Sequence, residues 1–342
     1  MMSAMDDPEA PGSRAPEESA SDRTPLPVLA VGLVVLTVVT TWLFGDLPWV
    51  VSGFSWPTTR AAPVGSSTEG LAGVRLTIPL VAAFLSSLVA FTAVGSVAAA
   101  LLPLVLTTRS SGHRLAAVGL TLATLVATTM AVTLHARRTI EEHAADAFAG
   151  DPRVLRGLVL VVFGTAAVGA LLGTLASLQV GFLPLAAAVA AGQLPEWLRG
   201  FLVDRRSLDH HARLVDGNAE WLVLVVMLVA FVLSVRRTVA WALLWPVAVA
   251  LIWVAVPFRV MTDSLAVQLR PSAGLPGTLP DILRGGLETF RASFWQAPQP
   301  RWPWLVAALL AGLWCVLERQ AGGRVRGPVG RWIARGSDPS ER

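Results

Sequence analysis

The stretch 155–194 reads LRGLVLVVFGTAAVGALLGTLASLQVGFLPLAAAVAAGQL and decides how the chain after it is placed. Its one charged residue is Arg156. A helix needs about 20 apolar residues to cross a hydrocarbon core of about 30 Å, so forty residues are too many for one crossing and barely enough for two. Gln179, Gly181 and Pro184 interrupt the apolar run near its middle. We therefore expect a helical hairpin that turns at 179–184, with a re-entrant loop over 182–203 as the alternative to a full second crossing.

The overall composition is that of an integral membrane protein. Of 342 residues, 54% are hydrophobic and 15% charged, whereas soluble domains carry about 25% charged residues. All 27 basic residues are arginine, and the absence of lysine excludes Walker-type phosphate binding and Schiff-base chemistry. Cys315 is the one cysteine, which excludes a disulfide framework or a thiolate metal cage. No basic stripe is interleaved with aromatics, so we expect no nucleic-acid partner.

The apolar runs predict an all-α polytopic membrane bundle of about eight transmembrane helices. The transmembrane domain is expected at 25–319, between a disordered cytoplasmic tail at 1–24 and an Arg-rich cytoplasmic tail at 320–342. We expect the 79–106 span to tilt or kink near Pro103, and the third helix to run on past His135 until Gly150 and Pro152 end it. The spans are predicted at 27–44, 79–106, 115–135, 155–178, 182–203, 221–235, 238–257 and 302–317.

The distribution of arginine predicts the topology. Arg236 and Arg237 lie in a short connection between two spans, and several arginines follow the last span. Positive loops stay cytoplasmic, so both segments should lie inside. Counting back with a full crossing at 182–203 also places the TTRSSGHR turn (107–114) and the N-terminal tail inside. The re-entrant alternative gives seven spans, an outside N-terminal tail and TTRSSGHR on the opposite face. The absence of Lys and Tyr suggests a GC-rich bacterial genome, and hence a bacterial cytoplasmic membrane.

Two outside segments have the pattern of amphipathic helices that lie on the outer membrane surface. In 196–220, apolar residues recur at helical spacing among charged ones. In the last outside loop, Leu283, Leu287, Phe290 and Phe294 are spaced 4, 3 and 4. A helix of this kind buries its apolar face among lipid headgroups, so membrane lipid is the expected partner.

Candidate catalytic residues are carboxylates on the predicted outer face. Asp46 directly follows the first span. Polytopic glycosyltransferases that use lipid-linked sugars place a catalytic carboxylate in the first outside loop, because the base must meet a donor held at the interface. Asp204 and Asp209 are further candidates, and Glu69 is a conceivable partner.

Substrate-binding candidates come from the same outer segments: Arg205, Arg206, His210, His211, Arg259 and Asp263. Adjacent histidines point about 100° apart on a helix and do not share one ion, so we expect no metal site, and no cofactor is implied. Arg259 and Asp263 stand four residues apart, and we favour a structural ion pair.

Gly169 and Gly173 form a G-x-x-x-G face. Small residues at this spacing let a neighbouring helix approach closely. We expect packing within the chain, with packing against another membrane protein as the alternative.

The function expected is that of a permease or accessory subunit that handles a lipidic or cell-wall precursor on the outer face. No predicted span carries an ionisable residue in its middle third, which argues against a proton-coupled antiporter. The short cytoplasmic loops offer little surface for an ATPase subunit to bind, which argues against an ATP-driven permease subunit. The alternative is an outward-facing, glycosyltransferase-like enzyme that acts through Asp46 and the 196–220 segment.

Overall fold

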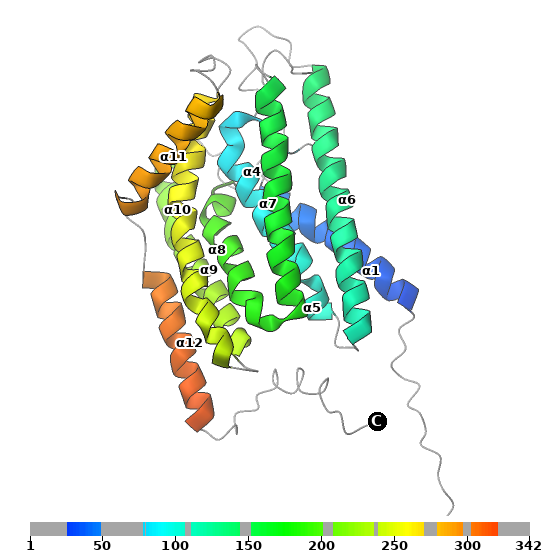
Figure 1. Cartoon of the computed structure of the whole chain (residues 1–342), viewed down its shortest axis with the longest axis vertical. Coiled ribbons are helices and arrows are strands. Elements are labelled where there is room, and N and C mark those ends of the chain that lie inside the picture. Colours follow the sequence, from blue (N-terminus) through cyan, green and yellow to red (C-terminus); the bar gives the residue numbers. More distant parts are fainter. Residues whose placement is uncertain are drawn as a thin grey trace, which may run out of the picture.

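The computed structural model describes residues 26–48, 78, 80–106, 111–143, 152–200, 208–235, 239–269, 279–296 and 302–320. Within these ranges every regular element is a helix, and the elongated helices lie side by side (Figure 1). The all-α prediction is confirmed for this part of the chain. The predicted tails at 1–24 and 321–342 lie outside the described residues.

Five of the described helical segments are long and apolar enough to cross a membrane. They are Leu85–Leu106, His113–Arg138, Arg153–Leu178, Asn218–Val235 and Ala240–Gln268. Two shorter apolar helices, Val28–Val39 and Leu305–Leu317, occur where the first and last spans are predicted. The composition and length of these segments fit a membrane bundle.

Helix α4 (Leu85–Ala100) forms the centre of the bundle because its small side chains allow neighbours close on several sides. It packs against α7 (Pro152–Leu178) and α8 (Leu183–Arg199). A Cβ on Gly173 of α7 would lie 2.6 Å from the Ala100 Cβ, and one on Gly169 would overlap Ser96. The G-x-x-x-G face is therefore filled by α4, which confirms the prediction that it packs within the chain.

The hairpin predicted within 155–194 is present. Helix α7 ends at Leu178, a 3₁₀ turn covers Val180–Phe182, and α8 returns along α7. Within the turn, Gly181 lies against the indole ring of Trp241: an added Cβ would stand 2.0 Å from a ring carbon, so no larger residue fits this position. The Phe182 amide donates to the Gln179 carbonyl oxygen over 3.0 Å.

Two other local predictions are confirmed. The helix is interrupted at Leu101, between α4 and α5 (Leu102–Leu106), two residues before Pro103. Proline has no amide hydrogen and crowds the preceding turn, which favours such a break. Helix α6 (Ser111–His143) continues well past His135.

The first run differs from expectation in its helix type, and two other predictions are wrong. The first run is helical over 26–48, but the α-helix α1 (Leu26–Val39) gives way to a π-helix, η2 (Thr40–Gly45), before α-helical geometry returns at 46–48. Helix α10 (Trp245–Gln268) does not end at Pro257 but passes through it, so Arg259 and Asp263 lie on the same helix as the span. The 196–220 stretch is not one surface helix: its first residues end α8, and its last ones begin α9 (Leu208–Val235) in unbroken helical register with the apolar run after them.

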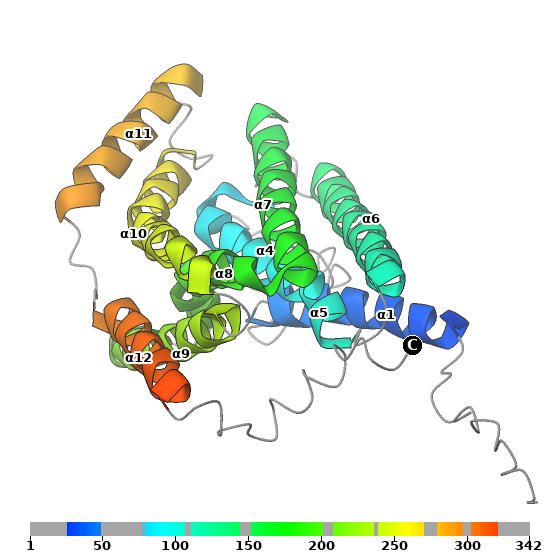
Figure 2. The same cartoon turned by 60° about the horizontal axis from the view of Figure 1, so that its bottom comes forward.

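The helix ends fall into two groups. Figure 1 places the start of α1, the start of α6, the α7–α8 turn and the end of α12 (Trp302–Gln320) toward the lower end of the bundle. The end of α6, the start of α7 and the start of α11 (Leu279–Gln296) lie at the upper end. Figure 2 shows α11 and α12 at the periphery, where α11 packs against α10 and α12 against α9.

Candidate functional site

Two glycines that face each other, Gly45 and Gly95, allow the segment before Asp46 to lie directly against α4. A Cβ on Gly45 would stand 2.8 Å from the Phe91 carbonyl oxygen, and one on Gly95 would stand 2.9 Å from the Gly45 Cα. Both positions therefore need glycine for the π-helical segment η2 to rest directly on α4. Because π-helical turns are rare and concentrate at functional sites, this segment marks the residue that follows it, Asp46, as a candidate.

This contact places Asp46 deeper in the bundle than the sequence suggested. Phe91 and Gly95 are the sixth and tenth residues after Leu85 in the segment Leu85–Leu106, which corresponds to about 9 and 15 Å along the helix axis. Asp46 was expected beyond the end of a straight first span. Instead it lies beside the middle of Leu85–Leu106, the most buried of the five long apolar segments, because η2 packs directly against α4 there.

A small cavity opens beside the Asp46 side chain between η2, α4, α6 and α7. Its volume is about 30 Å³, which is room for one or two water-sized guests. Its apolar wall includes Phe91, Val132 and Val162. Its polar lining consists of Thr41, Asp46, Thr92, Ser96, Thr128, Thr129 and Thr133. None of the described residues that line the cavity is basic.

Two hydroxyl groups of the cavity lining are oriented as acceptors. Thr41 Oγ1 donates its proton to the Thr37 carbonyl oxygen over 2.7 Å, and Ser96 Oγ donates to the Thr92 carbonyl oxygen over 2.6 Å. Each of these two oxygens then has lone pairs left but no free proton. Thr133 is completely buried, and its Oγ1 has no hydrogen-bond partner within the described part of the chain. The cavity therefore combines one carboxylate with hydroxyl oxygens, two of which can only accept.

A second polar cluster joins α4, α8 and α10 toward the upper end of the bundle. Ser86 Oγ lies 2.8 Å from Thr262 Oγ1 and donates to the Asp263 carboxylate. Next to it, Ser87 Oγ donates to Glu196 Oε1 over 3.0 Å, and Arg199 lies 3.7 Å from the other oxygen of the same carboxylate. Serine hydroxyls at the start of α4 thus bind carboxylates from two other helices.

The end of α8 connects this cluster with the segment that carries Asp46. Trp197 Nε1 donates to the Phe44 carbonyl oxygen over 2.5 Å and to the Gly45 carbonyl oxygen over 3.1 Å. Three residues later, Gly200 packs against Pro48: a Cβ added to Gly200 would lie 2.7 Å from the Pro48 Cβ. These contacts hold η2 and Pro48 against the end of α8.

The remaining predicted site residues divide into described and undescribed ones. Asp263 is exposed and Arg259 half-buried, both on α10. Asp209, His210 and His211 begin α9, but their side chains are not among those described. Glu69, Asp204, Arg205 and Arg206 lie outside the described residues altogether.

Sequence reasoning overlooked the hydroxyl residues around Asp46. Their signal was present: Thr92 and Ser96 are four residues apart on one helix, as are Thr129 and Thr133 on another. Residues at this spacing share a helix face, so polar pairs within otherwise apolar spans indicate a polar interior surface. Asp46 was recognised, but with the wrong neighbours.

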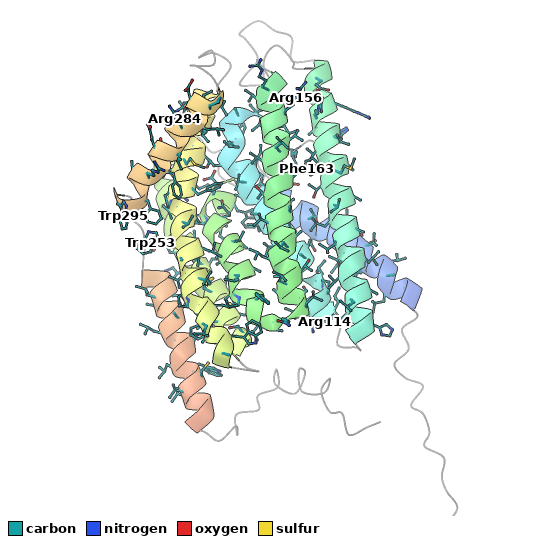
Figure 3. All side chains as sticks on the ribbon, viewed as in Figure 1. Arg114, Arg156, Phe163, Trp253, Arg284 and Trp295 are labelled. Carbon is teal, nitrogen blue, oxygen red and sulfur yellow. The ribbon has the colours of Figure 1, made fainter. Side chains whose placement is uncertain are left out.

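Two labelled arginines lie near opposite ends of the bundle. In Figure 3, Arg114 lies at the lower end of α6 and Arg156 near the upper end of α7. Arginine at these positions suits the polar boundaries of a hydrocarbon layer. Trp253 and Trp295 lie instead on the side formed by α10 and α11 (Figure 3), where Trp253 stacks on Phe294 with ring centroids 5.9 Å apart.

Comparison with known proteins assigns no relative: the chain matches no family model, no curated protein and no solved structure.

Proposed function

We propose that this chain is a multi-pass permease of the bacterial cytoplasmic membrane that moves a lipidic or cell-wall precursor of the cell envelope. The observation that carries the proposal is the cavity around Asp46, level with the middle of the apolar segment Leu85–Leu106. An ionisable group at that depth costs several kcal/mol and is usually retained for a substrate or ion pathway. An accessory subunit that merely holds a partner has no comparable need for it.

The position of Asp46 also favours transport over the glycosyltransferase-like alternative. A base that acts on a lipid-linked sugar must reach a headgroup at the membrane surface. A cavity of about 30 Å³ is too small for a sugar ring, because ligand pockets generally measure several hundred Å³. A series of hydrogen bonds instead extends from Asp263 to the segment that precedes Asp46. Ser86 donates to Asp263, Ser87 donates to Glu196, and Trp197 donates to the Gly45 carbonyl oxygen.

The topology we propose has eight spans, with both tails in the cytoplasm. The five long apolar segments would be completed by α1 with η2, by α8 and by α12. This count is supported by the grouping of the start of α1, the α7–α8 turn and the end of α12 toward one end of the bundle (Figure 1). Arg114 lies at that end (Figure 3), as expected for a cytoplasmic side.

We further propose that α11 lies at the outer lipid surface and guides the lipidic substrate. Its buried side is formed by Ile282 and by Gly286, where a Cβ would meet the Leu265 side chain of α10 at 2.9 Å. Leu283, Leu287 and Trp295 are exposed, at 62%, 45% and 77%, whereas Phe290 and Phe294 are half-buried and Phe294 stacks on Trp253 of α10. Exposed leucines with a terminal tryptophan suit a lipid interface.

Reconstituted vesicles provide the test. The purified full chain is incorporated into liposomes that contain a polyprenyl phosphate with a fluorescent NBD group, and dithionite is added outside. We expect the protein to expose inner-leaflet probe to the quencher at a rate above that of empty vesicles, and Asp46→Asn to slow it at least tenfold. Glu141→Gln, which alters an exposed carboxylate on α6, should retain the wild-type rate. A wild-type rate equal to that of empty vesicles would refute lipid transport.

A further inference from the structure

We propose that the Asp46 cavity is a binding site for a small monovalent cation of the size of sodium. The inference concerns binding alone and does not require that the substrate be a lipid. It rests on three observations: the charge balance of the cavity, the orientation of its hydroxyl groups, and a buried hydroxyl group without a partner.

The charge balance calls for one positive charge. Asp46 is the one acidic residue among the described residues that line the cavity, and none of them is basic. An unpaired charge inside an apolar bundle is expensive, and a bound cation offsets much of that cost. A single carboxylate matches a monovalent ion, whereas Ca²⁺ sites usually combine six to eight oxygen ligands, several of them from carboxylates.

Two of the hydroxyl groups have the orientation that a cation requires. The protons of Thr41 and Ser96 are donated to main-chain carbonyl oxygens one helical turn earlier. Their oxygens therefore offer only lone pairs to a guest. At these two positions a guest must supply positive charge or hydrogen-bond donors, and the Asp46 carboxylate disfavours an anion. The volume of about 30 Å³ admits a small ion with about one water molecule but not an organic ammonium group with a carbon skeleton.

Thr133 supplies the independent observation. Its side chain is 0% exposed, it lines the cavity, and its Oγ1 has no partner within the described part of the chain. Buried polar groups are nearly always satisfied, so an orphaned hydroxyl beside a cavity indicates a guest that binds there. Thr121, twelve residues or about three turns earlier on α6, is also buried and lacks a partner within the described residues, but it does not line the cavity. The two threonines form a matched pair for a test.

The experiment measures the thermal unfolding midpoint of the purified full chain in detergent. Sodium chloride is titrated against choline chloride at constant ionic strength, because a ligand of the native state raises the midpoint in a saturable way. We expect sodium to raise the midpoint and choline to leave it unchanged. Asp46→Asn should abolish the sodium-dependent shift. Thr133→Val should weaken apparent sodium affinity at least fivefold, and Thr121→Val should leave it as in the wild type.

Several results would overturn the proposal. These are the absence of any sodium-specific shift in the wild type, an equal shift in Asp46→Asn, or an equal loss in both threonine variants. If Asp46→Asn does not yield folded protein, the Thr133→Val and Thr121→Val pair decides the question alone. A midpoint that responds to pH but not to sodium would also refute the cation site, since it would indicate a proton on Asp46 instead. Sodium binding without lipid movement in vesicles would leave the site standing and refute only the proposed substrate.

Discussion

Replacement of Gly95 by alanine tests whether close backbone contact holds the Asp46 segment against α4. A Cβ at this position would stand 2.8 Å from the Thr41 carbonyl oxygen and 2.9 Å from the Gly45 Cα. Both are main-chain atoms and cannot rotate away, so η2 must shift outward. Overpacking of this kind costs about 1–3 kcal/mol. The better helix propensity of alanine stabilises the helix by about 0.8–1 kcal/mol, so the free energy of unfolding should fall by up to about 2 kcal/mol.

Gly164 of α7 provides the matched control. It is also inside a helix, but a Cβ there would meet nothing within 4 Å. Gly164→Ala should therefore gain up to about 1 kcal/mol, because only the propensity term applies. The two variants should differ by about 1–3 kcal/mol in the free energy of unfolding. Equilibrium unfolding by SDS in mixed micelles measures this difference, with tryptophan fluorescence as the signal.

The sodium titration gives a second measurement on the same proteins. A shifted η2 moves Asp46 relative to Thr92 and Ser96, so Gly95→Ala should weaken sodium binding while Gly164→Ala leaves it unchanged. If Gly95→Ala were as stable as Gly164→Ala, the direct contact between η2 and α4 would be refuted. The proposed position of Asp46 would be refuted with it.

Two further predictions concern the connection at α8 and the topology. Trp197→Phe removes the indole donor to the Phe44 and Gly45 carbonyl oxygens, and it should lower the free energy of unfolding by about 1–3 kcal/mol. The control Trp295→Phe, at a 77% exposed position, should change that free energy little. Equal effects of the two variants in SDS unfolding would contradict the Trp197 contact. The topology is tested in a Cys315→Ser background with a thiol reagent that does not cross the membrane. In intact cells, Gln179→Cys should be protected from the reagent and Ser207→Cys should be labelled. Labelling of Ser207→Cys only after permeabilisation would contradict the eight-span topology.

The parts of the fold that depend on local sequence were predictable. The turn at 179–184 follows from Gln179, Gly181 and Pro184, and the interruption before Pro103 follows from the geometry of proline. The close packing of α7 on α4 follows from the spacing of Gly169 and Gly173. Each of these features is encoded within a few neighbouring residues, so no knowledge of the three-dimensional contacts was needed.

The boundaries that failed depend on contacts between distant segments. The predicted span ends at Pro257, but α10 continues through this residue to Gln268. On the far side of Pro257, the Thr262 and Asp263 side chains bind Ser86 of α4, and Leu265 packs under Gly286 of α11. Tertiary contacts of this kind offset the one hydrogen bond that proline removes.

The depth of Asp46 was beyond sequence reasoning for a related physical reason. In a straight helix, position along the chain gives depth at about 1.5 Å per residue, and on that measure Asp46 falls past the end of the first apolar run. The rule fails at η2 (Thr40–Gly45), where the Gly45–Gly95 contact holds the chain directly against the middle of the segment Leu85–Leu106. The depth of a carboxylate is set by the helix it touches, not by the apolar run it follows. The argument against ion coupling, which assumed that no span held an ionisable group at mid-depth, therefore loses its premise at Asp46.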